Sequence, residues 1–139
     1  MKITFELPNV QGKERPRHSR FGVYTPTKTK HYENMIMTKY KLAGGIYHDV
    51  PAALKVTIQC FYRVPKNTSK SVKEKAITNE LKHIKHKSDI DNVAKAVLDG
   101  LNKVAYKDDC QVAELEITKQ YATDEKLIVT VEPIGVGLR

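Results

Sequence analysis

The sequence is poor in cysteine and has no long apolar run. Only Cys60 and Cys110 occur among its 139 residues, too few for a disulfide framework, and free thiols suit a reducing cytoplasm. No stretch of about 18 apolar residues is present, so no membrane-spanning helix is expected. The N-terminal MKITFELPNV alternates apolar and polar residues and lacks the apolar core of a signal peptide. We therefore expect a cytoplasmic protein without a membrane partner, folded as a single domain over residues 1–139.

Two common catalytic and metal-binding patterns are also missing. No Ser-His-Asp or Cys-His arrangement stands out in the sequence. His83 and His86 have no accompanying Cys or His pair of the kind that binds zinc. We therefore do not expect these histidines to bind zinc, and we expect no small-molecule cofactor.

Basic and acidic side chains are unevenly distributed. Residues 11–41 and residues 63–87 each carry eight basic and two acidic side chains, a net charge of +6, whereas residues 88–139 carry six basic and ten acidic ones, a net charge of −4. Basic flanks of this kind serve solubility or bind a polyanion, most commonly nucleic acid. A membrane surface is the weaker alternative, since neither basic segment has a wide apolar face with aromatic anchors.

Apolar periodicity predicts an α+β (α/β) chain of about four strands and about three helices. Alternation predicts strands at 2–8, 53–62, 111–119 and 126–132, and the short connection 123–125 predicts that the last two form a hairpin. Helical spacing predicts helices from Thr25-Pro26 to Gly44-Gly45, from a capping box at Ser71 to residue 82, and from Ile90 to Val104. Residues 9–25 show no sustained period and are expected to be irregular, and the tail 133–139 is expected to be flexible.

Basic side chains that are candidates for DNA binding lie on both flanks. The stretch 9–25 interleaves them with Phe21 and Tyr24, which favours phosphate contacts and base stacking, although a solvated flexible loop is an equally good account. The lysine-rich helix at 72–82 leads into a basic run before the first central aspartate, and a lysine-rich helix is usually just a solvated one. The residues predicted to bind DNA are Lys13, Arg15, Arg17, Arg20, Lys28, Lys73, Lys85 and Lys87.

Five aspartates gather in residues 86–111, HKSDIDNVAKAVLDGLNKVAYKDDCQ. Asp89 and Asp91 lie at the start of a predicted helix, where capping is their simplest role. Asp108 and Asp109 lie in a predicted turn, where aspartate is common. Each role explains one aspartate, but neither explains the D-x-D and D-D pairs together. Several carboxylates are the ligands that a hard metal such as Mg²⁺ takes, with water and a substrate phosphate completing its shell.

The acidic segment also carries a family resemblance. KSDIDNVAKAVLDGLNKVAYKDDCQVAELEITK resembles the core signature of the RusA family of Holliday junction resolvases, which runs D-x-D-N, a lysine four residues after the second aspartate, L-D-x-L, then D-D-x-Q-V and a strand ending in lysine. ERPRHSRFGVYTPTKTKHYE resembles the basic N-terminal stretch of that family. The resemblance covers most of the chain, in order. Ser88 stands where the family often has proline, and Cys110 occupies a variable position.

The resemblance implies roles for particular residues. Asp89, Asp91 and Asp109 correspond to the catalytic, metal-binding carboxylates, and Lys95 corresponds to an essential basic residue. Asp108 matches a companion aspartate and is a further candidate ligand. On the residues alone, Lys95 could form only an exposed ion pair with Asp91, worth about 0.3–0.5 kcal/mol. Asp99, two turns beyond Asp91, is expected to have a structural role.

The resemblance also implies an activity. It indicates a mixed α/β homodimer that uses Mg²⁺, with Mn²⁺ able to substitute, to cut a four-way DNA junction, the Holliday junction, by paired symmetric nicks in recombination and repair. A two-fold dimer suits this substrate because it presents two equivalent sites to two symmetry-related strands. Two alternatives stay open: a non-catalytic protein that binds branched DNA, and a nuclease that acts on other branched DNA.

Overall fold

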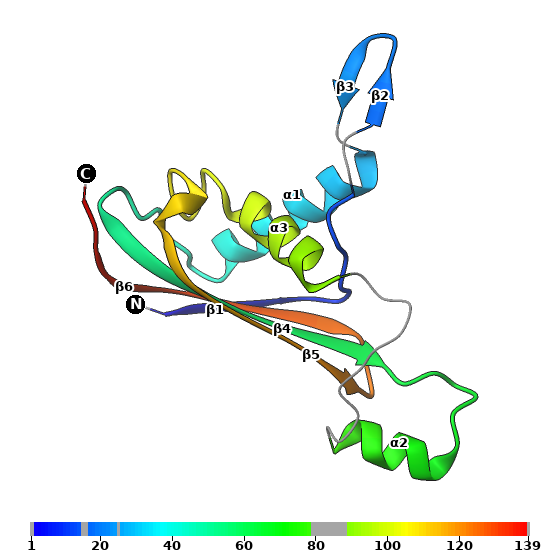
Figure 1. Cartoon of the computed structure of the whole chain (residues 1–139). Helices are drawn as coiled ribbons and strands as arrows, with labels where there is room; N and C mark the ends of the chain where they lie inside the picture. Colours follow the sequence, from blue (N-terminus) through cyan, green and yellow to red (C-terminus); the bar gives the residue numbers. More distant parts are fainter. Residues whose placement is uncertain (1, 15–16, 25, 79–88, 139) are drawn as a thin grey trace.

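A computed structural model describes residues 2–14, 17–24, 26–78 and 89–138. Helices α1 and α3 lie over one face of a sheet, α2 lies beyond the end of β4, and the β2–β3 hairpin extends beyond the start of α1 (Figure 1). The elements in chain order are β1 (Ile3–Leu7), β2 (Arg17–Ser19), β3 (Gly22–Tyr24), α1 (Thr27–Leu42), β4 (Ala52–Arg63), α2 (Lys70–Ile77), α3 (Ile90–Leu101), the 3-10 turn η1 (Asp109–Gln111), β5 (Val112–Ala122) and β6 (Lys126–Val136). No helix in these ranges is long and apolar enough to cross a membrane.

The main sheet has four strands in the order β1-β6-β4-β5, with β4 and β5 parallel and the other neighbours antiparallel. This mixed sheet with its helices confirms the predicted α+β fold. The predicted hairpin of the last two strands is wrong, because β4 lies between β5 and β6. The connection 123–125 can span roughly 10 Å, about twice the spacing of roughly 4.8 Å between neighbouring strands. It is therefore long enough to cross the end of β4.

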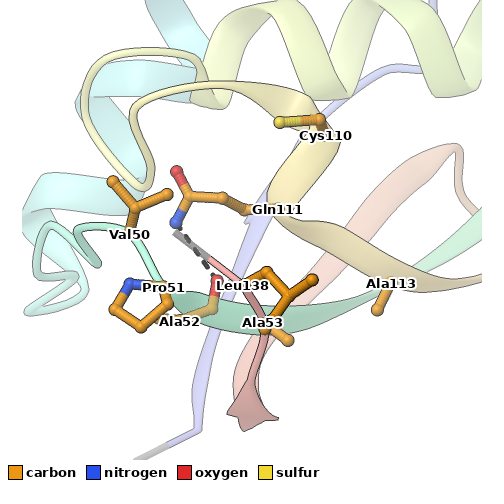
Figure 2. A pocket seen from close by; sticks show the side chains of 9 residues that line it. Val50, Pro51, Ala52, Ala53, Cys110, Gln111, Ala113 and Leu138 are labelled. Atoms are coloured by element: carbon orange, nitrogen blue, oxygen red, sulfur yellow. Dashed lines mark hydrogen bonds between the residues drawn. The ribbon is translucent and has the colours of Figure 1, made fainter.

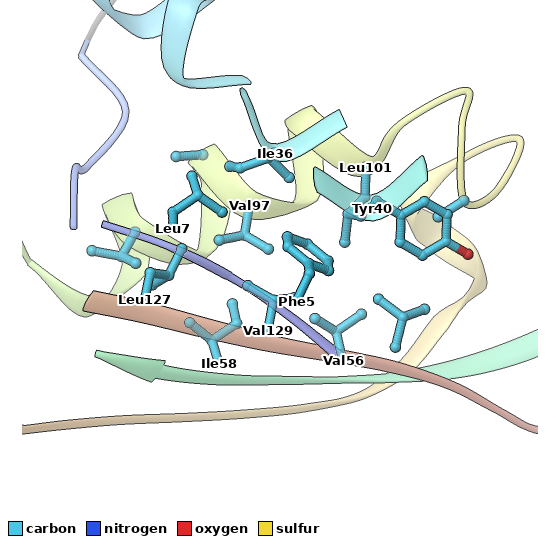
Figure 3. Packing of buried hydrophobic residues seen from close by; sticks show 14 of the residues in the cluster. Phe5, Leu7, Ile36, Tyr40, Val56, Ile58, Val97, Leu101, Leu127 and Val129 are labelled. Atoms are coloured by element: carbon cyan, nitrogen blue, oxygen red, sulfur yellow. The ribbon is translucent and has the colours of Figure 1, made fainter. Parts of the chain in front are cut away.

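The hydrophobic core lies between the sheet and the two helices (Figure 3). On α3, Val93, Val97 and Leu101 are fully buried, as the apolar stripe predicted. A Cβ atom on Gly100 would lie 2.8 Å from the Cβ atom of Ile36 in α1, so glycine is what permits the two helices to approach so closely. This packing makes α3 a fixed support for the side chains at its two ends.

Several predicted boundaries differ from the structure. Residues 9–25 are not wholly irregular, because β2 and β3 pair within them. Helix α2 is capped by Ser69, whose hydroxyl accepts a hydrogen bond from Val72 N at 3.4 Å, so the capping box predicted at Ser71 is wrong. Helix α1 begins after Pro26, and Thr25 lies outside the described residues.

The ends of α3 and β6 also differ. Helix α3 ends at Leu101 and not at Val104, because the backbone at Asn102 is extended and Lys103 has a positive φ of 73°. Strand β6 continues to Val136, beyond its predicted end at residue 132. Its last residues pair with Ala52 and Ala53 of β4, so the first part of the segment 133–139 is a paired strand.

Candidate active site

The N-terminal end of α3 presents two aspartates to solvent. Asp89 is the N-cap residue with an extended backbone, and its carbonyl oxygen accepts hydrogen bonds from Asn92 N and Val93 N, both at 3.1 Å. Its carboxylate makes no capping hydrogen bond to α3, and both Asp89 and Asp91 are exposed. Capping therefore does not account for the Asp89 side chain, and both carboxylates are accessible to a ligand. Lys95, one turn after Asp91, is exposed as well.

Asp99, farther along α3, is tied to the N-terminal loop. The Lys13 ammonium forms ion pairs with Asp99 and with Glu33 of α1, the latter at 3.3 Å. The Lys13 backbone N–H also donates to the Asn92 carbonyl oxygen at 2.9 Å. Burial alone lowers the pKa of Lys13, but the hydrogen bond to Asp99 and the charges of both carboxylates outweigh it and raise that pKa. Lys13, which the sequence predicts to bind DNA, clamps the loop onto both helices.

Beyond the C-terminal end of α3, Gln111 holds the acidic turn in place. Its side-chain oxygen accepts hydrogen bonds from Lys107 N at 2.9 Å and Asp108 N at 3.3 Å. Its side-chain nitrogen donates to the carbonyl oxygens of His48 at 2.9 Å and Ala52 at 3.2 Å. Gln111 is buried, and with Asp108 it forms a capping box over η1. The sequence interpretation gave it no role, although its D-x-x-Q spacing is the signature of such a box.

A pocket of about 250 Å³ lies against Gln111 (Figure 2). The exposed Cys110 borders it, and the hydrogen bond from Gln111 to Ala52 lies within it. Its other lining residues are small or apolar and come from 50–53, Ala113 and 137–138. No charged side chain lines this pocket, so we assign it no part in phosphodiester chemistry.

The carboxyl groups of Asp108 and Asp109 lie close enough to each other to share a proton. The backbone N–H of Cys110, which donates to Asp108 at 3.2 Å, and the hydrogen bond to Asp109 lower the pKa of Asp108. The hydrogen bond to Asp108, slight burial and the negative charges of Asp108 and Asp99 raise the pKa of Asp109. Two carboxylates this close repel each other when both are ionised. A cation would relieve that repulsion, so this donor set fits a hard divalent metal.

The two acidic pairs lie at opposite ends of α3. Tyr106 pins the acidic turn to the C-terminal end of the helix by donating its hydroxyl to the Leu98 carbonyl oxygen at 2.5 Å. Asp99, whose charge acts on Asp109, lies near the C-terminal pair. Asp91 precedes Asp99 by eight residues, which is about 12 Å of helix. Among the described residues, no group of three His, Cys, Asp or Glu side chains could hold a metal ion. A single chain therefore does not gather the three aspartates predicted to bind the metal.

The basic residues predicted to bind DNA lie on separate surfaces. Arg17 and Arg20 belong to the β2–β3 hairpin, and Lys28 is exposed in the first turn of α1. Lys73 is half-buried in α2, which lies beyond the end of β4, away from the hairpin (Figure 1). Three others lie outside the described residues: Arg15, Lys85 and Lys87.

Comparison with known proteins assigns the family. The family model described as Endodeoxyribonuclease RusA matches residues 8–132. The chain is also 30% identical over 135 residues to a protein of Bacillus subtilis (strain 168) that bears the name Uncharacterized protein YqaN, and the match covers 92% of each chain. The matched residues include both acidic pairs, Lys95 and the β2–β3 hairpin. The chain therefore belongs to the RusA family of endodeoxyribonucleases.

Proposed function

We propose that this protein is a Mg²⁺-dependent endonuclease that acts in the cytoplasm as a homodimer and resolves Holliday junctions by paired symmetric nicks. The observation that carries the proposal is the presence, in a RusA family chain, of two carboxylate pairs at the two ends of one helix, α3. The pair Asp89 and Asp91 is exposed and not used for capping. The pair Asp108 and Asp109 is held by Gln111 and already brings two carboxyl groups into contact.

The proposed chemistry is hydrolysis of a DNA phosphodiester bond. Asp89, Asp91 and Asp109 are the metal ligands, with Asp108 as a companion, and Mn²⁺ is able to substitute for Mg²⁺. A bound divalent ion supplies polarisation of the scissile phosphate and activation of a water molecule. Lys95 projects from α3 one turn after Asp91, where its ammonium can neutralise negative charge that develops on the phosphate.

An apolar strip beside α3 supports the homodimer. In the parallel register, Leu115 and Ile117 of β5 lie opposite Val56 and Ile58 of β4, so their side chains point to the face that carries α1 and α3. Val56 and Ile58 are fully buried, but Leu115 is 44% exposed, and Ile90 at the start of α3 is 40% exposed. Strand β5 is also an edge of the sheet. A second copy packed on this strip would cover apolar surface that one chain leaves open.

A two-fold dimer through this strip would also bring together the aspartates that lie apart in one chain. A two-fold axis perpendicular to α3 sets the two α3 helices antiparallel, so the N-terminal end of one lies beside the C-terminal end of the other. Asp89 and Asp91 then share a site with Asp109 of the partner subunit. Each dimer has two such sites, one for each of the two strands that are cut.

The test is cleavage of four-way, three-way and linear DNA of matched sequence in Mg²⁺. We expect paired nicks in the four-way junction and none in the linear duplex, with Mn²⁺ supporting the reaction and EDTA abolishing it. Equal cutting of three-way DNA would favour a nuclease for other branched structures. Salt-dependent binding without a product in any divalent metal would favour the non-catalytic binding protein.

A further inference from the structure

The β2–β3 hairpin carries an aromatic side chain that has no place in the core. Phe21 is 86% exposed and Val23 is 62% exposed. The two strands are three residues each, and the hairpin extends away from the sheet and helices (Figure 1). Little of the Phe21 side chain is buried within this chain, so its ring is accessible to a ligand.

The tip of this hairpin has a defined conformation. Arg20 and Phe21 form the two-residue turn between Ser19 and Gly22, which pair with each other. The Ser19 hydroxyl accepts a hydrogen bond from Phe21 N at 3.2 Å and donates one to the Gly22 carbonyl oxygen at 3.3 Å. Gly22 has a φ of 118°, which favours glycine. The Arg20 guanidinium lies over the Phe21 ring, 5.0 Å from its centroid, so the tip presents an aromatic face and a cation together.

The segment that contains the hairpin is basic, although Glu14 lies just before it, with its backbone N–H bonded to the Thr29 hydroxyl. From Arg15 to Tyr32 the sequence has five Lys and Arg residues and no Asp or Glu. Lys28 and Lys30 are exposed at the start of α1, and His18 is exposed on β2. This charge is complementary to a polyanion. An aromatic ring within a basic surface is the combination that binds nucleotides whose bases are unstacked, through base stacking and phosphate contacts.

The hairpin is also tied to the candidate active site. The Lys13 backbone bonds to Asn92, the residue after Asp91, and the Lys13 ammonium is paired with Asp99 and Glu33. Strand β2 begins four residues after Lys13. The chain that leads into the hairpin is thus anchored on α3, between the acidic residues at its two ends.

We propose that Phe21 and Arg20 form a stacking finger, in which Phe21 stacks on unpaired or unstacked bases at a DNA branch point and Arg20 contacts a flanking phosphate. The finger distinguishes branched DNA from continuous duplex, whose bases are already stacked on one another. This inference rests on the proposed function, because the branch point is the substrate of that function.

The test is equilibrium binding in EDTA, where no cleavage occurs, to a four-way junction and to a duplex of the same sequence. The variants are Phe21→Ala, Phe21→Tyr and, as a matched control, Leu42→Ala, which removes a 77% exposed side chain from the far end of α1. Loss of one stacked base weakens binding by about 5- to 150-fold. We expect this loss for Phe21→Ala on the junction, less than about a twofold change on duplex, and junction binding retained by Phe21→Tyr and Leu42→Ala.

A second variant tests the cation of the finger. Arg20→Ala should weaken binding to both DNA forms and reduce by about one the slope of log K against log salt concentration. An unchanged slope would show that Arg20 makes no phosphate contact.

Two outcomes would overturn the finger. They are wild-type junction binding by Phe21→Ala and an equal loss of binding on junction and duplex. Cleavage in Mg²⁺ is measured separately. A wild-type protein that binds junctions through Phe21 but cuts none would contradict the proposed function and leave the finger standing.

Discussion

The two ends of α3 carry similar carboxylates in different settings. At the N-terminal end, Asp89 and Asp91 are exposed, and the Asp89 carboxylate makes no capping bond. At the C-terminal end, the carboxyl groups of Asp108 and Asp109 lie close together, and Gln111 fixes their turn against β4 through its hydrogen bonds. Both pairs are exposed, but only the C-terminal pair is held in position before any ligand arrives.

This difference indicates how a small fold can build a catalytic centre. A metal site needs ligands held in a defined geometry, but a site completed in a single chain would bury several like charges together. Placing the pairs at opposite ends of a helix keeps that repulsion low in the monomer. In the proposed dimer, the pair that Gln111 holds in one chain meets the pair at the N-terminal end of α3 in the other.

The largest expected effect is a loss of DNA cleavage when either acidic pair loses a carboxylate. Asp91→Asn and Asp109→Asn each remove a proposed metal ligand, and each should lower junction cleavage by at least about 1000-fold. Junction binding should be retained, because asparagine keeps the shape and removes negative charge near DNA. Asp124→Asn, in the exposed turn between β5 and β6, is the matched control and should cut normally. Wild-type cutting by Asp91→Asn would remove the N-terminal pair from the proposal.

Lys95→Met tests whether Lys95 takes part in catalysis or only forms a surface ion pair. As a group that neutralises charge on the phosphate, Lys95 should contribute about 100-fold to the rate constant at saturating DNA, with little change in melting temperature. If it only pairs with Asp91, its loss should lower the free energy of unfolding by about 0.3–0.5 kcal/mol and leave cleavage unchanged. Single-turnover cleavage together with thermal unfolding distinguishes the two roles.

Gln111→Ala tests whether the C-terminal pair depends on its support. The substitution leaves buried N–H and C=O groups unpaired, and it should lower the free energy of unfolding by roughly 2–4 kcal/mol. Cleavage by the folded fraction should also fall, because the acidic turn loses its anchor. Gln59→Ala, on the exposed side of β4, serves as the control and should change stability by less than about 0.5 kcal/mol. Equal stability of the two variants in urea unfolding would contradict this role for Gln111.

Much of the fold can be predicted from local pattern, but its long-range pairings cannot. The stripe of α3 and the alternation of β4 are visible in the sequence because both bury one face, as Val97 and Ile58 show. The position of β5 outside β4 depends on how a three-residue connection crosses a strand end, which no local signal specifies. The separation of the acidic pairs is likewise hidden, since residues 102–108 determine where Asp109 lies relative to Asp91.

The ion pairs of Lys13 are likewise long-range contacts that the local sequence does not predict. Its basic surroundings indicate a DNA contact, whereas its partners Glu33 and Asp99 are 20 and 86 residues away in sequence. Lys13→Met should have the smallest effect, about 1 kcal/mol of stability, because the pairs are partly exposed. The difference from wild type should shrink in 1 M salt, where screening weakens ion pairs. A difference in urea midpoint that does not depend on salt would show that the ion pairs contribute nothing.

The central claim is that the two ends of α3 act in one site, contributed by two chains. Differently tagged Asp91→Asn and Asp109→Asn chains can be co-expressed, purified as heterodimers and tested on a four-way junction in Mg²⁺. In the proposed dimer, one of the two sites then keeps Asp91 from one chain and Asp109 from the other, so we predict that the heterodimer nicks one strand while both homodimeric variants are inactive. A heterodimer as inactive as either variant alone would contradict the claim.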